Sequence, residues 1–77
     1  MIHEHDIIVL VCDLPEHGLK EGDLGTVVHV YHDPAGYEVE FMTLGGETVA
    51  VASLEKGKVR PVGRHEMHHA RPMGKQA

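Results

Sequence analysis

Apolar and polar residues alternate most cleanly in the middle of the chain. Tyr37, Val39 and Phe41 alternate there with Glu38 and Glu40. A period of two residues is typical of a β-strand with one buried face. This segment is therefore predicted to be a strand with its aromatic and aliphatic side chains in the core and both glutamates on the outside.

Four other segments also have the length and composition of strands. They are residues 7–12, 26–31, 47–53 and 58–62. The first is apolar throughout, which predicts a strand buried on both sides or one whose outer face meets a partner. In the second, Val27, His29 and Tyr31 are predicted to share a face. In the third, Val49 and Val51 are predicted to point inward. Pro61 confines the last strand to a sheet edge, because proline cannot donate a ladder hydrogen bond.

The segments between the strands carry turn and loop signals. Residues 13–21 contain proline and glycine and predict a long loop, with Leu14 and Leu19 dipping into the core. Glycine-rich turns are predicted at residues 22–25 and 44–46, and one short helical turn at residues 54–57. Five short strands with these connections predict an all-β fold, a small SH3-like antiparallel barrel over residues 1–62.

From residue 63 onward the apolar pattern ends. Residues 63–77 are rich in histidine, arginine, glycine and proline. We expect them to form a flexible, disordered C-terminal tail.

Charge and composition narrow the possible partners. The 77-residue chain has a formal net charge of −5. Residues 1–62 are strongly acidic, which disfavours nucleic acid as a partner and favours a basic protein surface. One cysteine, Cys12, excludes an internal disulfide. Together with the absence of a signal-peptide pattern or a long apolar run, it predicts a cytoplasmic protein that does not bind membranes.

Four blocks of the sequence, in order, resemble a family of small bacterial proteins known only as a domain of unknown function. The blocks are Asp-Leu-Pro-Glu-His-Gly-Leu-Lys from residue 13, Gly-Asp-Leu-Gly-Thr-Val-Val from residue 22, Tyr-Glu-Val-Glu-Phe from residue 37 and Val-Arg-Pro from residue 59. The second block is also similar to KOW-type barrels and to the barrel of the nitrile hydratase β subunit. The resemblance implies an SH3-like fold and an antitoxin- or immunity-type partner protein. It does not extend to the tail.

The tail contains the pattern H-E-x-x-H at residues 65–69. In zinc proteases a helix places both histidines of this pattern on one side of the metal. Here glycine and proline crowd the motif, so we do not expect catalysis. His65, His68 and His69 are nevertheless suitable ligands for Cu, Ni or Zn. Metal binding through the tail is therefore an alternative function, although adventitious binding is the simpler expectation and no cofactor is required. His3 and His5 would form a second pair if they lay on one strand face.

The preferred hypothesis is a non-enzymatic module that binds another protein. Loops and exposed aromatic side chains on a rigid barrel are common contact sites. The contact residues that we predict lie on the long loop and the acidic strands: Glu16, His17, Tyr31, Tyr37, Glu38 and Glu40. A homo-oligomer is also possible, with Ile8, Leu10 or the face of Ala50 and Ala52 against a second copy.

Overall fold

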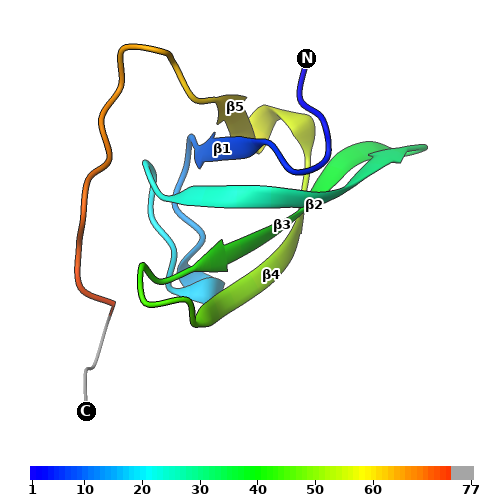
Figure 1. Cartoon of the computed structure of the whole chain (residues 1–77). Coiled ribbons are helices and arrows are strands. Elements are labelled where there is room, and N and C mark those ends of the chain that lie inside the picture. Colours follow the sequence, from blue (N-terminus) through cyan, green and yellow to red (C-terminus); the bar gives the residue numbers. More distant parts are fainter. Residues whose placement is uncertain (74–77) are drawn as a thin grey trace.

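The structure is a computed structural model that describes residues 1–73 of the chain. It contains the five strands β1 (Ile7–Leu10), β2 (Leu24–His32), β3 (Ala35–Met42), β4 (Thr48–Leu54) and β5 (Val59–Pro61). Two single 3₁₀ turns, η1 (Pro15–His17) and η2 (Lys56–Lys58), lie in the connections. All strand pairs are antiparallel, and the strand order is β4-β3-β2-β1-β5 (Figure 1).

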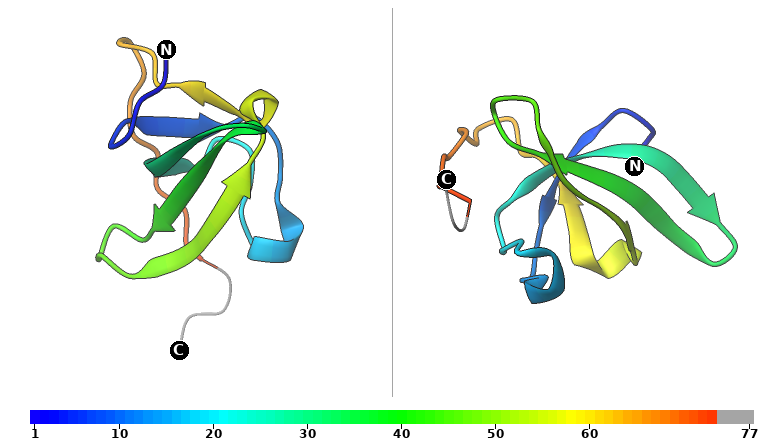
Figure 2. Two further views of the ribbon diagram at one scale, coloured as in Figure 1. Left: turned by 90° about the vertical axis from the view of Figure 1, so that its right-hand side faces the viewer. Right: turned by 90° about the horizontal axis from the view of Figure 1, so that it is seen from below.

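The sheet curls on itself instead of lying flat. Two further views show β1 and β5 turned against the β2–β3–β4 meander, with the loop that carries η1 at one end (Figure 2). The prediction of a small, five-stranded antiparallel all-β fold with a barrel-like shape is confirmed. β5 is an edge strand, as Pro61 requires.

The core lies on the inner face of this curled sheet. One buried row runs through Val27, Val39 and Ala52, which are paired across three strands. Phe41 and Tyr37 flank this row on β3 and are 2% and 7% exposed. The alternation predicted for β3 is therefore confirmed, with both of its glutamates on the opposite face.

A β-bulge in β2 changes the alternation expected for that strand. Val27 pairs with Val39 and His29 pairs with Glu38, so Val28 has no partner of its own. The extra residue shifts the phase of the strand. As a result Val27 is buried while His29 is exposed, and the prediction that they share a face is wrong.

β4 has a similar irregularity at its start. Phe41 pairs with Ala50 and Met42 pairs with Thr48, which leaves Val49 between them. Val49 packs against the core as predicted, and the inward residues that follow it are the small Ala50 and Ala52 and then Leu54. The prediction that Val51 points inward is wrong, because its side chain is 48% exposed.

The small residues on the inner face allow neighbouring strands to approach closely. A Cβ atom on Gly25 would lie 2.5 Å from Cγ1 of Val39 and 2.8 Å from Cε1 of Phe41. Gly25 therefore lies inside β2, where it makes room for the ring of Phe41, and is not only a turn residue as predicted. Large side chains on β3 are thus matched by small ones on its neighbours.

The loop from β1 to β2 is fixed to the barrel at both of its leucines. Leu14 and Leu19 form an isolated β-bridge and are 5% and 3% exposed. This confirms that they dip into the core. β1 is shorter than predicted, because the chain leaves the sheet after Leu10 and Cys12 lies in the loop.

Residues 63–73 form neither helix nor strand, but they are attached to the barrel. A turn from Gly63 to Glu66 starts the segment, and the carboxylate of Glu66 accepts two hydrogen bonds from the guanidinium of Arg60, at 2.9 and 2.7 Å. The segment then runs along one side of the molecule (Figure 1). Residues 63–73 of the predicted tail are thus irregular in structure and contact the barrel, and the rest of the predicted tail lies outside the described residues.

Candidate functional site

The outer face of β2, β3 and β4 carries two glutamates held by hydroxyl groups. Oε1 of Glu38 accepts hydrogen bonds from the hydroxyls of Tyr31, at 3.0 Å, and Ser53, at 2.5 Å. Oε2 of Glu40 accepts one from the hydroxyl of Thr48 at 2.7 Å. We call these five residues the acidic patch. The register of the sheet brings them together from three strands.

In the described part of the chain, the carboxylates of the acidic patch have no cation of their own. Within residues 1–73, neither Glu38 nor Glu40 forms an ion pair with lysine, arginine or histidine. Hydroxyl donors orient a carboxylate but leave its charge in place. The patch therefore presents two oriented negative charges to the solvent.

Exposed apolar side chains border this patch. Val28, Met42 and Val51 are 41%, 47% and 48% exposed. Val51 is the direct neighbour of Glu40 across the sheet, and Thr26 is its neighbour on the other side, followed by the exposed Ile7. The outer face thus combines negative charge with uncovered aliphatic surface, a combination found at many contact surfaces.

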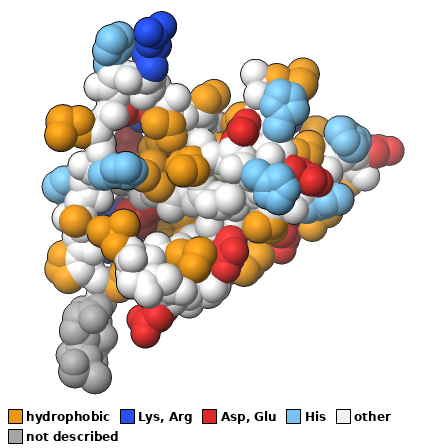
Figure 3. Space-filling view, viewed as in Figure 1, with side chains coloured by type: hydrophobic (Ala, Val, Ile, Leu, Met, Phe, Trp, Pro, Cys, Tyr) orange, Lys and Arg blue, Asp and Glu red, His pale blue; other side chains and the backbone are white. Residues whose placement is uncertain are grey.

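A groove of about 580 Å³ lies between the N-terminal segment and the end of the β2–β3 hairpin. Its lining includes His3, Glu4, His29, Tyr31 and His32. Histidine side chains gather over this region, and a second set follows the C-terminal segment (Figure 3). Nδ1 of the His29 ring lies 3.4 Å from a carboxylate oxygen of Glu4, and the ring makes an edge contact with that of Tyr31.

These histidines do not form a metal centre in the part of the chain that the structure describes. No group of three or more His, Cys, Asp or Glu side chains in residues 1–73 could hold a metal ion. His65, His68 and His69 are exposed, and no helix brings them onto one face. His3 and His5 precede β1, and His5 has a left-handed φ of 74°, so the predicted pair on one strand face is wrong.

The long loop lies next to the acidic patch through Glu16. A shallow hollow of about 260 Å³ between η1 and the end of β4 is lined by Glu16, Ser53 and Lys58, among others. Ser53 is the residue that donates to Glu38. Glu16 and His17 are both exposed, so the two predicted loop contacts remain accessible.

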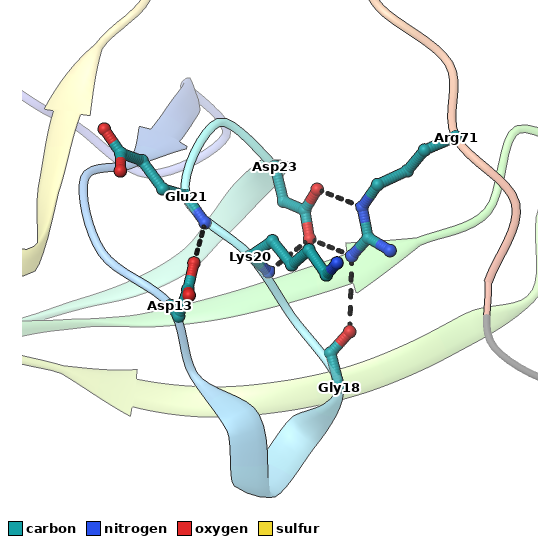
Figure 4. Close-up of polar contacts among 6 residues, drawn as sticks. All are labelled: Asp13, Gly18, Lys20, Glu21, Asp23 and Arg71. Carbon is teal, nitrogen blue, oxygen red and sulfur yellow. Dashed lines mark hydrogen bonds and ion pairs between the residues drawn. The ribbon is translucent and has the colours of Figure 1, made fainter.

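The far end of the same loop holds a second polar cluster, shown in Figure 4. The guanidinium of Arg71 donates two hydrogen bonds to the carboxylate of Asp23. Nε donates to Oδ1 at 2.9 Å and Nη2 donates to Oδ2 at 2.5 Å. Nη2 also donates to the carbonyl oxygen of Gly18 at 3.2 Å. Burial acts to raise the pKa of Asp23, but the hydrogen bonds from Arg71 and from the backbone N–H of Lys20 outweigh it, so that the pKa is lowered.

Two sets of predicted surface residues lie in the core instead. Tyr37 is 7% exposed, because its place in the β3 alternation turns it inward. It cannot act as an exposed contact. Ile8, Leu10 and Ala52 are likewise buried in the core cluster, so they are not available to a second copy of the chain. On β1 the exposed apolar residue is Ile7, at 51%.

Sequence reasoning missed the residues that complete these clusters. Ser53 and Thr48 support the glutamates only because the β4 register places them opposite β3. Arg71 meets Asp23 across 48 positions of sequence. The available signals were weak: an Asp in a Gly-Asp-x-Gly turn, and an isolated arginine in a tail with no periodicity.

Comparison with known proteins places the chain in a family without assigning it a function. Residues 4–61 match the model of a domain of unknown function, DUF4926, and the protein belongs to that family. No curated protein and no solved structure matches the chain. No helix in residues 1–73 is long and apolar enough to cross a membrane.

Proposed function

We propose that this protein is a non-enzymatic binding module whose acidic patch and neighbouring loop contact a basic segment of another protein. One observation carries the proposal. Glu38 and Glu40 are held in place by three hydroxyls, bordered by exposed aliphatic side chains, and have no cation within residues 1–73. A lysine or arginine flanked by apolar residues complements such a surface in both charge and polarity.

The fold and the resemblance described above support this proposal in a general way. The strand order β4-β3-β2-β1-β5, with its long loop after β1, is compatible with the SH3-like barrel that the sequence predicts. Small barrels of this kind commonly present contacts on loops and on a sheet face. An antitoxin- or immunity-type role in the cytoplasm would fit a basic partner that the acidic face neutralises.

The test compares capture by full-length variants that carry the same change of charge. Wild type, Glu40→Lys and Asp33→Lys are immobilised and exposed to lysate of the source cells. Asp33 is an exposed acidic residue in the β2–β3 turn, outside both the acidic patch and the hollow beside it. We expect wild type and Asp33→Lys to enrich the same protein, and Glu40→Lys to lose most of it. Circular dichroism should show that all three are folded.

A second measurement tests the chemistry of the contact. Capture through exposed charges should weaken as salt rises, because ionic strength screens them. Tyr31→Ala should weaken it as well, since Tyr31 both contributes exposed ring surface and donates to Glu38. If Glu40→Lys and Tyr31→Ala both capture as much as wild type, the acidic patch is not the contact surface.

A further inference from the structure

The contact between Arg71 and the β1–β2 loop has the geometry of a ligand in a prepared site. Two N–H groups of one guanidinium meet both oxygens of Asp23, and one of them also meets the carbonyl of Gly18 (Figure 4). The side chains of Arg71 and Asp23 are only 26% and 17% exposed. A planar fork that meets a carboxylate at two points is specific to arginine, since a lysine ammonium offers only a point charge.

Hydrogen bonds within the loop and to β1 hold the loop around both acceptors. Oδ2 of Asp23 accepts the backbone N–H of Lys20 at 2.8 Å, and the backbone of Asp23 accepts from Leu10 N–H at 2.9 Å. Gly18 has a left-handed φ of 71° at the end of η1, where its N–H donates to Pro15. That conformation favours glycine and fixes the direction of the following carbonyl.

A second acidic group strengthens the same site. Asp13 is tied to the loop by the N–H of Glu21, which donates to its Oδ1 at 2.9 Å. Its charge contributes to the raised pKa of Arg71, after the larger contribution of the hydrogen bond to Asp23, while burial acts in the opposite direction. The site is therefore built from the backbone and two carboxylates of one loop.

The arginine in this site comes from outside the family domain. The match to the family ends at residue 61, whereas Arg71 belongs to the segment that follows. Every group that accepts a hydrogen bond from Arg71 lies inside the matched region. The domain thus carries the receptor and its C-terminal extension carries the occupant.

We infer that the β1–β2 loop is an arginine-recognition site, which Arg71 fills in cis and which an arginine of the partner protein fills when the C-terminal segment is displaced. This inference rests on the proposed function, because it takes the occupant to be a protein segment. The C-terminal segment then acts as an internal competitor. The apparent affinity of the partner is then its intrinsic affinity multiplied by the fraction of molecules in which the site is free.

The test supplies the arginine in trans. The probe is an acetylated and amidated peptide with the sequence of residues 68–73, added to full-length wild type and to full-length Arg71→Ala. The readout is the NMR shift of the backbone amides of Gly18 and Asp23. We expect those amides to move, and half-saturation to require up to about fivefold less peptide in Arg71→Ala, in which the internal competitor is missing.

The matched control is the same peptide with citrulline in place of arginine. Citrulline keeps the shape of the side chain but not its charge, so it should not shift these amides in Arg71→Ala. Introducing Asp23→Asn into the Arg71→Ala chain should also abolish binding. If that double variant fails to fold, the citrulline comparison decides alone.

Equal binding to wild type and Arg71→Ala, equal binding of the two peptides, or shifts confined to other residues would overturn the inference. None of these outcomes involves the acidic patch. Loss of capture in Glu40→Lys could still be observed if the loop failed this test, so the proposed function and the inference fail separately.

Discussion

The two faces of the β2–β3–β4 meander are built from the same strands but organised differently. On the inner face Val27, Val39 and Ala52 form a row with at most 5% exposure. On the outer face the next row pairs His29, Glu38 and Ser53, all of them polar. Successive residues of β3 therefore contribute alternately to a packed core and to an accessible polar surface.

A second contrast concerns the carboxylates. Glu38 and Glu40 are held by hydroxyls, whereas Asp23 is paired with an arginine of the same chain. Both arrangements satisfy hydrogen bonds, but only the second neutralises charge. An internal arginine occupies the loop site, whereas the glutamates of the outer face have no such partner within residues 1–73. The experiments below test these distinctions in order of decreasing effect on stability.

The largest effect is expected when the inner face loses its aromatic side chain. Phe41→Ala should cost about 3–5 kcal/mol, because it removes a buried ring and leaves a cavity. A domain of this size has roughly 4–10 kcal/mol in total, so much of its stability would be lost. Urea denaturation followed by circular dichroism measures the change.

The neighbouring residue is the control for this substitution. Met42 is 47% exposed on the outer face, and Met42→Ala should change stability by no more than about 0.5 kcal/mol. Similar costs for the two substitutions would show that the faces do not differ in packing.

Adding one carbon to the inner face should have the next largest effect. Gly25→Ala places a Cβ against Val39 and Phe41, and overpacking of this kind costs about 1–3 kcal/mol. Gly57→Ala is the matched control, because no atom lies within 4 Å of its added Cβ. The difference between their thermal midpoints measures the strain, and equal midpoints would contradict the close packing at Gly25.

Removing the arginine from the loop site should have a smaller effect. Arg71→Ala should cost about 1 kcal/mol or less, the range of a partly exposed ion pair. Arg64→Ala is the control, since Arg64 is exposed and forms no ion pair within residues 1–73. Amide hydrogen exchange of residues 18–23 should quicken in the first variant only. Faster exchange in both would point to a general effect of charge.

Acidification should release the C-terminal segment without any substitution. The pKa of Asp23 is lowered from 3.8, and that of Glu66 is lowered to about 2 by Arg60 and by the N–H of Gly63. A carboxyl group whose pKa is lowered by folding stabilises the folded state at pH values above its pKa in the unfolded chain. This stabilisation is lost as the pH falls through the pKa of the group in the folded protein.

Both contacts should therefore be intact at neutral pH. The contribution of Glu66 should be lost between pH 4.5 and about 2, and that of Asp23 below pH 3.8. NMR titration of the Arg60 and Arg71 side chains follows each contact. Release near pH 6 would contradict the assignment to these carboxylates.

The sequence predicted the strands better than the faces they present. β3 was predicted correctly because Tyr37, Val39 and Phe41 keep strict alternation over their whole length. For β4 the prediction holds for Val49, which packs against the core, but fails for Val51, because the irregularity at Val49 that changes the alternation is invisible in the sequence. The inward position of the small Ala50 follows from its pairing with the large Phe41, which the sequence does not reveal.

The candidate sites were predictable in part. The glutamates of β3 were identified because they alternate with core residues, but the same alternation should have excluded Tyr37 as a contact. The loop site was missed because Asp23 and Arg71 are joined only by tertiary structure. A tail without periodicity contains no signal for what it lies against.

The unpaired residues of β2 and β4 bear on how the length of this chain can vary. Val27 and His29 pair with Val39 and Glu38, which are adjacent in β3. Deletion of Val28 would therefore remove the bulge and leave the pairing of β2 with β3 unchanged. Val49 occupies a comparable position between Thr48 and Ala50. Loss of Val39 itself would instead exchange the inward and outward residues along the rest of β3. Single-residue deletions are therefore expected to be tolerated best at Val28 and Val49 and least within β3.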